Sequence, residues 1–240
     1  MPIADSIIYG KKSLKWFLKQ PGFARLLSFV RYYPSWLAHL QPGRNPVGDQ
    51  TPWMNFAAID FLRKIVHKEM RVFEFGSGGS TMFWQSRVQE VISVEHDLSW
   101  YNNMKKILDQ GLTKNVRYIL AEPEVDPLFD QKDFRNPADF ISNDREYQGK
   151  TFEKYAKAID AYPETYFDVV IVDGRARPSC IQQGMSRLKK NGWLVVDNSE
   201  RKYYTQPFIF DSNSWDIRKF AGPVPYMRDF SETSFFKKLI

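Results

Sequence analysis

The sequence predicts an α/β protein with a doubly wound, mainly parallel sheet, preceded by a helical leader. Two observations carry the prediction. Short apolar runs alternate with helical segments between residues 71 and 198, and a glycine-rich turn follows the first of these runs. Strands that alternate with helices need parallel crossover connections, and 240 residues are enough for one such domain with an appendage.

The elements of the domain follow in order from residue 51. Thr51 suits the N-cap of a first helix and Pro52 its first turn, and helical apolar spacing carries this helix to about Lys68. The expected strands are 71–75, 90–97, 116–122, 167–174 and 193–198, and the expected helices between them are 81–89, 100–111 and 179–192.

Two segments break the alternation. Residues 123–165 form a long polar insertion that ends in a helix within 152–162. Connections of this length in a compact domain are usually functional or mobile. Residues 214–240 read as two strands joined by a proline-containing turn, too close for a helical crossover, so we expect them to pair antiparallel at one edge of the sheet.

The basic charge of the chain belongs to its first segment. Residues 1–44 contain seven Lys or Arg and a single acid, Asp5, which accounts for the whole net charge of +6. A domain that binds nucleic acid along its face usually carries the basic excess itself, so we expect no nucleic-acid partner. We place the domain boundary at residues 50 and 51.

The leader, residues 1–50, is expected to form short helices broken by Pro21, Pro34 and Pro42. Its aromatic residues lie among basic ones, and two interpretations stay open. Residues 1–44 either contact an anionic membrane surface peripherally or pack on the domain or on a second subunit of a homodimer. The single cysteine, Cys180, excludes an intrachain disulfide, no apolar run reaches about 20 residues, and no secretion signal is evident. We therefore expect a cytoplasmic protein with peripheral membrane contact as an option.

The turn after the first strand suits a phosphate-free adenosine cofactor. Gly76, Gly78 and Gly79 allow close backbone approach, and the helix that follows offers free N–H groups near the hydroxyl residues Ser77, Ser80 and Thr81. Glu95, near the end of the second strand, could accept both hydrogen bonds of a ribose diol. Thr81 stands where a dinucleotide fingerprint needs a third glycine, and no lysine marks a phosphate-binding loop.

Five segments carry a family resemblance: EFGSGGST, SVEHD, FDVVIVDG, GWLVVDN and TSFFKKL. Together they resemble a class I S-adenosylmethionine-dependent methyltransferase over residues 51–240, with most similarity to small-molecule O-methyltransferases. The resemblance implies a seven-stranded sheet in the order 3-2-1-4-5-7-6 with an antiparallel last strand. It also implies contacts to the methionine end at Glu74, Gly76 and Gly78, to the ribose at Glu95, and to the adenine near His96 and Glu122. The candidate cofactor-binding residues are Glu74, Gly76, Ser77, Gly78, Ser80, Thr81, Glu95, His96, Glu122 and Asp173.

The candidate catalytic residues are Asp173, Arg175 and Asp197. Asp173 ends the most apolar strand and could take a proton from an acceptor, hold the cofactor, bind a metal, or cap the turn. Arg175 and Arg177 could clamp an acidic substrate or neutralise Asp173 and Asp197.

A metal remains an open question at this stage. Asp197 with Asn198 after the fifth strand resembles the Mg²⁺ site of catechol-type O-methyltransferases. That family carries a lysine where this chain has Ala176.

We expect methyl transfer from S-adenosylmethionine to an oxygen of a small-molecule or saccharide-like acceptor, with the insertion 123–165 over the acceptor site. Two alternatives stay open: an aminopropyltransferase of the spermidine-synthase type, and a non-catalytic cofactor-binding scaffold.

Overall fold

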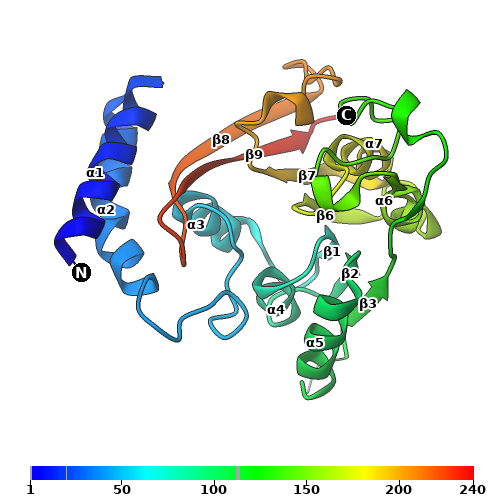
Figure 1. The fold of residues 1–240 in the computed structure, drawn as a ribbon, viewed down its shortest axis with the longest axis horizontal. Helices are drawn as coiled ribbons and strands as arrows, with labels where there is room; N and C mark the ends of the chain where they lie inside the picture. The colour runs from blue at the N-terminus through cyan, green and yellow to red at the C-terminus, as the bar shows by residue number, and fades with distance from the viewer. Residues whose placement is uncertain (1, 20, 112–113) are drawn as a thin grey trace.

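A seven-stranded sheet organises the computed structural model, which describes residues 2–19, 21–111 and 114–240 (Figure 1). Its strand order is β3-β2-β1-β6-β7-β9-β8, and β9 runs antiparallel to both β7 and β8. The strands are β1 Arg71–Phe75, β2 Glu90–Glu95, β3 Val116–Leu120, β6 Phe167–Val172, β7 Leu188–Asp197, β8 Trp215–Pro223 and β9 Phe230–Lys238. Since β4 and β5 lie in a separate small sheet, this order is the predicted 3-2-1-4-5-7-6, and the predicted fold class is confirmed.

Helices cover both faces of the sheet because side chains alternate along its strands. Val72 of β1 belongs to the apolar cluster that includes α3 and α4, whereas Phe73 and Phe75 belong to the cluster on the opposite face, with α6 and α7. The helices of the domain are α3 Phe56–Ile65, α4 Gly79–Gln85, α5 Leu98–Asp109, α6 Glu153–Ala156 and α7 Arg177–Arg187.

The first helix of the domain begins later than predicted. α3 starts after Asn55, whose side-chain oxygen accepts the N–H of Ala58 at 3.0 Å, and it ends at Ile65. The expected cap at Thr51–Pro52 is therefore wrong. Asn is as good an N-cap as Thr, and the Thr51 carbonyl lies against Gly79 of α4, where a Cβ on Gly79 would come within 2.4 Å of it.

The predicted helix 179–192 is too long at its end. α7 stops at Arg187, and β7 already begins at Leu188, which pairs with Phe167. Lys189 extends along this strand to reach both carboxylate oxygens of Asp168, at 2.8 and 2.9 Å. The register with β6 then shifts, and Asn191 takes a positive φ of 65° at the irregularity.

The insertion 123–165 has little regular structure. β4 Glu124–Val125 pairs antiparallel with β5 Lys150–Thr151, and short 3-10 turns lie at Phe129–Gln131 and Arg145–Tyr147. α6 and the 3-10 turn Lys157–Ala161 occupy the segment where a helix was predicted. Phe152, Tyr155 and Ile159 anchor this segment in the core.

The leader forms two helices, α1 Pro2–Lys19 and α2 Phe23–His39. The predicted break at Pro21 is confirmed, because Pro21 lies between the helices. The predicted break at Pro34 is wrong, because α2 runs through it. Proline removes the hydrogen bond to the carbonyl four residues earlier; here that residue is Val30, which is exposed.

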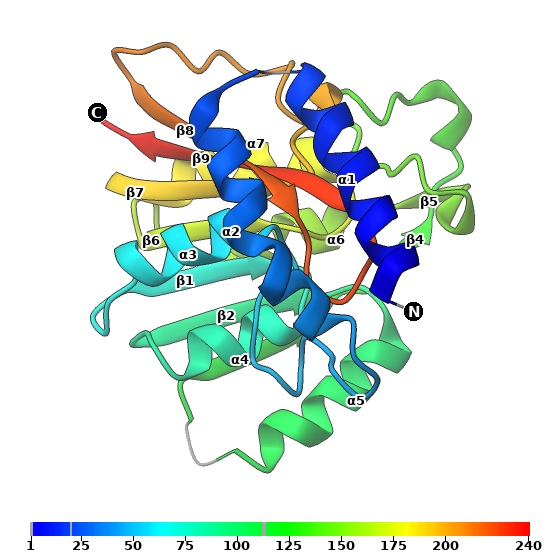
Figure 2. The same ribbon diagram turned by 90° about the vertical axis from the view of Figure 1, so that its left-hand side faces the viewer.

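The two helices of the leader lie against the β8–β9 hairpin (Figure 2). Tyr9 and Trp16 of α1 and Phe29 and Trp36 of α2 share a buried cluster with Phe230 and others. The indole N–H of Trp36 also donates to the Met227 carbonyl at 2.9 Å, in the turn between the two strands. The inner face of the leader is thus part of the folded domain.

Candidate cofactor-binding and active site

The turns after β1 and β6 meet at two glycines. Gly76 has a φ of +94°, and a Cβ there would lie 3.2 Å from the backbone of Gly174. A Cβ on Gly174 would lie 1.9 Å from the Tyr155 hydroxyl. A left-handed φ and contacts this close both favour glycine. The two turns therefore form one rigid edge at the carboxyl ends of the parallel strands.

Glu74 holds the glycine turn through hydrogen bonds to hydroxyl side chains. Its side chain is buried, and one carboxylate oxygen accepts hydrogen bonds from the hydroxyls of Thr81 at 2.6 Å and Ser93 at 2.8 Å. The Thr81 hydroxyl in turn accepts the Gly78 N–H at 3.1 Å. Burial raises the pKa of Glu74 to about 7, and these hydroxyls limit the rise. Glu74 lines neither cavity described below, so its position supports a role in holding the turn rather than the predicted contact to the methionine end.

Glu95 at the end of β2 accepts four hydrogen bonds from neighbouring N–H and hydroxyl groups. One oxygen accepts the Ser77 N–H at 3.1 Å and the Ser77 hydroxyl at 2.7 Å, and the other accepts the N–H groups of His96 at 2.7 Å and Asp97 at 3.0 Å. Burial alone would raise the pKa of Glu95, but His96, Asp97 and Ser77 outweigh it and lower the pKa to about 2. Glu95 is therefore an anion at any ordinary pH.

His96 lies in an aromatic enclosure next to Glu95. Its ring centroid is 5.3 Å from that of Tyr147, 5.6 Å from Phe152 and 5.7 Å from Tyr155. Glu122, predicted to lie near the adenine with His96, is instead exposed beyond the end of β3 and lines no cavity of the site. The structure brings His96 to Glu95 and leaves Glu122 outside.

Asp173 and Asp197 follow β6 and end β7, and Arg177 joins them. The Arg177 guanidinium is buried; it donates to an Asp173 carboxylate oxygen at 3.0 Å and to the backbone carbonyl of Asp197. Burial raises the pKa of Asp173 to about 6, with Arg177 opposing the rise. Burial and the Asp173 carboxylate together raise the pKa of Asp197 to about 8, and the Thr233 hydroxyl donates to Asp197 at 2.6 Å.

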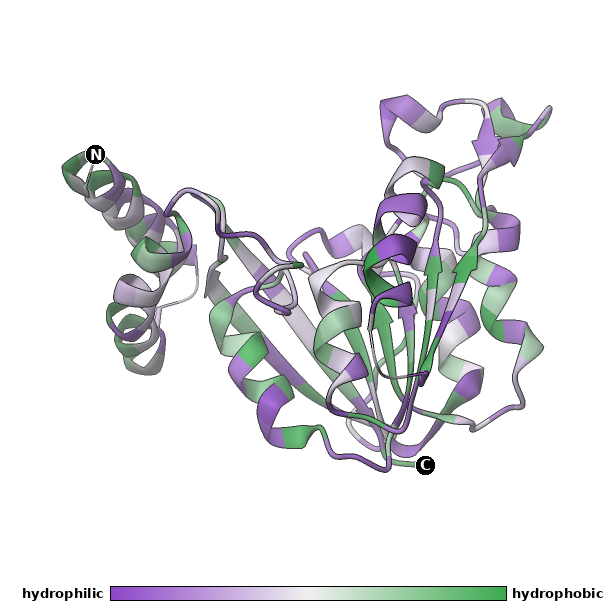
Figure 3. Ribbon diagram, turned by 90° about the horizontal axis from the view of Figure 1, so that it is seen from below, coloured by the Kyte–Doolittle hydropathy of each residue, from purple (hydrophilic) through white to green (hydrophobic). Residues whose placement is uncertain are grey.

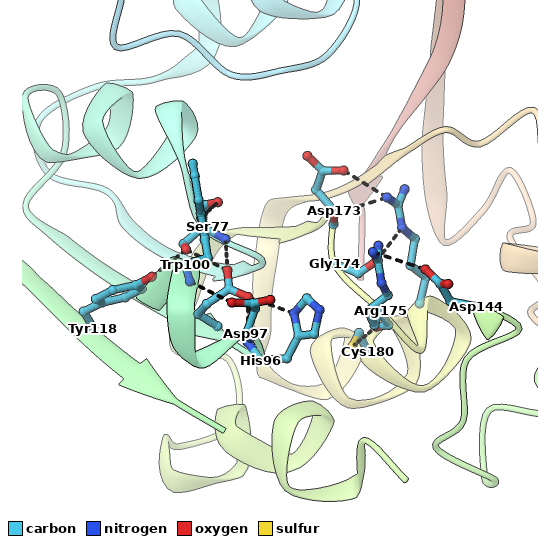
Figure 4. Close-up of polar contacts among 12 residues, drawn as sticks. Ser77, His96, Asp97, Trp100, Tyr118, Asp144, Asp173, Gly174, Arg175 and Cys180 are labelled. Carbon is cyan, nitrogen blue, oxygen red and sulfur yellow. Dashed lines mark hydrogen bonds and ion pairs between the residues drawn. The ribbon is translucent and has the colours of Figure 1, made fainter. Parts of the chain in front are cut away.

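The two arginines after β6 do different things. Arg177 forms an ion pair with the Asp173 carboxylate and donates to the backbone carbonyl of Asp197, so its contacts agree with neutralisation of Asp173 but not of the Asp197 side chain. Arg175 forms an ion pair with Asp144 of the insertion at 3.2 Å, and its guanidinium lies 5.8 Å from the Tyr147 ring centroid. Figure 4 shows Arg175 next to Asp144. Neither guanidinium lines the larger cavity.

Two adjoining cavities share Ser77, Ser80, Trp100 and Asp173 in their walls. The smaller, of about 300 Å³, also contains Glu95, His96, Tyr147 and Arg175. The larger, of about 640 Å³, extends past Asp173 to Asp197. Of the predicted site residues, Ser80 and Asp173 thus line both cavities, and Gly76 lines the smaller one.

Part of the wall of the larger cavity comes from segments that the sequence analysis did not assign to the site. They are Asn45–Val47 and Trp53 before α3, Glu200 and Arg201 after β7, and Val224, Met227 and Asp229 in the β8–β9 turn. No residue of the insertion 123–165 lines the larger cavity, and the insertion contributes Glu146 and Tyr147 to the smaller one. That the insertion covers the acceptor site stays a prediction. In the sequence, the prolines and glycines within 42–48 and 222–225 indicate turns in two of these segments.

The donor set does not fit a magnesium site. Asp173 is held by Arg177 and Asp197 by Thr233. Among residues 2–19, 21–111 and 114–240, no three His, Cys, Asp or Glu side chains come together as metal ligands. We assign no step to a metal.

Comparison with solved structures identifies the fold. A candidate methyltransferase from Streptococcus mutans, solved in complex with SAH, is 14% identical with a TM-score of 0.51, and the match covers 74% of this chain and 94% of that one. A methyltransferase-like protein from Silicibacter pomeroyi is 22% identical over 78% and 88% of the two chains, with a TM-score of 0.49. An rRNA methylase from Streptococcus thermophilus is 12% identical over 75% and 93%, with a TM-score of 0.48.

No protein-family model and no curated protein matches the sequence. The S. mutans structure, together with the strand order, establishes the fold of class I S-adenosylmethionine-dependent methyltransferases. Activity and acceptor have to be argued from the site itself.

Proposed function

We propose that this protein is an S-adenosylmethionine-dependent methyltransferase that acts on an oxygen of a small polyol or saccharide-like acceptor. The observation that carries the proposal is the position of Glu95. It is an anion at the carboxyl end of β2, beside the glycine turn, and it lines a cavity that adjoins a second, larger one. In a doubly wound sheet this edge is where ligands bind.

The residues present fit the cofactor. Glu95 would hold the ribose, His96 and Tyr147 the adenine, and the turn at Gly76, Gly78 and Ser80 the amino-acid end. Because Ser77 already occupies one oxygen of Glu95, a ribose diol would share or displace that hydroxyl. When bound, S-adenosylmethionine supplies an electrophilic methyl group on a sulfonium centre.

Asp173 is the group best placed to activate an acceptor. It lines both cavities, and with a pKa of about 6 it is mainly ionised at neutral pH yet basic enough to take a proton. The buried guanidinium of Arg177 fixes the carboxylate, which is the orientation that such a reaction requires. Asp173 would accept the proton released as the acceptor oxygen is alkylated.

The larger cavity suits a hydroxyl-rich acceptor. Trp53 and Trp100 are half-exposed in its wall and offer flat apolar faces, and carboxylates with Asn198 offer hydrogen-bond acceptors and donors. Indole faces and polar groups together suit the two sides of a sugar ring.

An aminopropyltransferase is the second candidate, and one observation favours it. Four acids, Asp173, Asp197, Glu200 and Asp229, line the larger cavity together with one arginine, Arg201, whereas Arg175 and Arg177 do not. A cationic amine would bind such a surface. The electrostatic case is weakened by Lys12, which pairs with Asp229 at 2.5 Å, and by the raised pKa of Asp197.

Calorimetry with S-adenosylhomocysteine, 5′-methylthioadenosine and NAD tests the cofactor. We expect binding of S-adenosylhomocysteine and none of NAD. Tight NAD binding would contradict the proposal. Tighter binding of methylthioadenosine than of S-adenosylhomocysteine would favour aminopropyl transfer.

An acceptor screen that detects S-adenosylhomocysteine release should then include saccharides, polyols, polyamines and RNA. Turnover of RNA alone would overturn the small-molecule acceptor. Cofactor binding without any turnover across a broad screen would favour the non-catalytic scaffold.

A further inference from the structure

The leader presents a second apolar face that the domain does not cover. Large apolar side chains occur along α1 and α2 with between 46% and 77% of their surface exposed. They are Ile3, Ile7, Leu14 and Leu18 on α1, and Phe23, Leu26, Leu27 and Val30 on α2. We call these eight residues the outer face. Figure 3 shows the two helices at one side of the molecule, with hydrophobic residues along both.

Most of the outer face lies opposite the packed face of its helix, whereas Leu26 lies only about 60–80° around α2 from Phe29 and Trp36. At 100° per residue, Ile7, Leu14 and Leu18 of α1 lie about 140–180° around the helix from the buried Tyr9 and Trp16. On α2 the exposed Phe23 and Leu27 lie similarly opposite the buried Phe29 and Trp36. A helix that is apolar on two opposite sides has two partners. The hairpin is one partner, and the outer face needs another.

The charged residues near the outer face indicate what kind of partner it binds. Lys11 and Lys15 lie near Leu14 and Leu18 on α1, whereas the Lys19 ammonium lies over the Trp16 ring, 5.0 Å from its centroid. No acid of the described chain forms an ion pair with any of the three lysines. The only acid of residues 1–44, Asp5, is buried on the packed side and held by Arg228 at 2.5 Å. The exposed surface of the leader is therefore apolar and basic, without acids of its own.

We propose that the outer face of α1 and α2 docks on an anionic lipid surface. The apolar side chains would enter the interfacial region, and Lys11 and Lys15 would reach the negatively charged headgroups with their flexible stems. A second copy of the chain fits less well, because a two-fold interface brings the same patch to both sides and would set lysines against lysines. No described helix is long and apolar enough to span a membrane, so the mode is attachment to one surface.

Vesicle flotation of the intact protein tests this directly. The probes are phosphatidylcholine vesicles with and without 30% phosphatidylglycerol, at low and high salt. We expect binding to the anionic vesicles, weak binding to the neutral ones, and release as salt screens the lysines. An intact protein that stays off anionic vesicles at low salt overturns the proposal.

Substitutions separate insertion from simple charge attraction. Leu18→Gln with Phe23→Gln keeps the net charge, and we expect at least about tenfold weaker vesicle binding. Lys11→Gln with Lys15→Gln should weaken binding by about tenfold or more, because each lysine near such a surface contributes severalfold. The matched control is Val125→Gln with Ile209→Gln, which are 80% and 84% exposed elsewhere. Equal loss in the control, or no loss in the leader variants, contradicts docking through the outer face.

Light scattering without lipid distinguishes the remaining occupant. A monomer that binds vesicles supports the proposal. A stable dimer that Leu18→Gln with Phe23→Gln converts to a folded monomer, with no vesicle binding in either form, shows that a second copy covers the outer face instead. Circular dichroism confirms that each variant remains folded.

Discussion

Ser77 and Glu95 are joined twice, because the backbone N–H and the hydroxyl of Ser77 both donate to one oxygen of the Glu95 carboxylate. The glycine turn after β1 and the acid at the end of β2 are thereby a single unit. The other Glu95 oxygen is held by the backbone at the start of α5. Removing the charge should therefore affect both the shape of the turn and the affinity of whatever lies in the smaller cavity.

Glu95→Gln should weaken S-adenosylhomocysteine binding and lower stability at pH 7 by about 1–3 kcal/mol, since an amide cannot satisfy all of these donors. The folded pKa of Glu95 is depressed to about 2, so its stabilisation is present above the unfolded value near 4.5 and is lost as pH falls toward 2. Urea unfolding should show the gap between variant and wild type narrowing over that window. Glu122→Gln is the matched control; an equal loss of affinity there would restore Glu122 to the site.

Asp173→Asn should lower turnover by about 10²–10⁴-fold, the usual contribution of a positioned base. Affinity for S-adenosylhomocysteine should change little. Because the pKa of Asp173 is raised to about 6, wild-type activity should rise through that pH as the carboxyl loses its proton, and the variant should lack this limb. A variant with wild-type turnover would leave Asp173 as the anchor of Arg177 and no more.

Asp197→Asn should make the protein less sensitive to alkaline pH. The pKa of Asp197 rises from about 3.8 unfolded to about 8 folded, so its contribution favours folding at low pH and is lost as pH rises, by about 1.4 kcal/mol per unit up to pH 8. Asn keeps an oxygen for the Thr233 hydroxyl. Unfolding at pH 5 and pH 8.5 measures the effect, with Asp130→Asn as the exposed control. If wild type and variant show the same pH dependence, Asp197 is not a buried, proton-holding group.

Gly79→Ala should destabilise the protein strongly. A Cβ there would lie 2.2 Å from the Pro46 carbonyl oxygen and 2.4 Å from that of Thr51, and backbone cannot move away cheaply. Gly10→Ala is the control, because a Cβ there meets nothing within 4 Å and alanine is the better helix former by about 1 kcal/mol. Thermal melts should fall for the first and rise slightly for the second. An unchanged melt for Gly79→Ala would show that the 46–51 connection is free to shift.

The sheet order and the acid of β2 could be predicted because they depend on local pattern and on rules of chain topology. Apolar runs of five or six residues specify strands, and the close spacing of β8 and β9 specifies their antiparallel pairing. Glu95 could be found because an acid at the end of the second strand faces the ligand edge in any such sheet. These features follow from residues near one another in the chain.

The walls of the larger cavity could not be predicted because they depend on distant contacts. Trp53 reaches the site because its indole N–H donates to the carbonyl of Pro225, 172 residues further along the chain, at 3.0 Å. Met227 is placed by Trp36, and Arg175 is turned to Asp144. Nothing in the local sequence of the insertion or the leader says which of them covers which cavity.

The β8–β9 turn belongs to two surfaces at once. Trp36 and Lys12 of the leader hold it at Met227 and Asp229, and both of these residues also line the larger cavity. A shift of α1 and α2 that moves Trp36 or Lys12 would act on Met227 and Asp229, and so on the wall of the larger cavity. By thermodynamic reciprocity, a molecule bound in the cavity would change the affinity of the leader for its own partner by the same free energy. The protein thus has the parts of a two-site coupling device, with the turn as the coupling element.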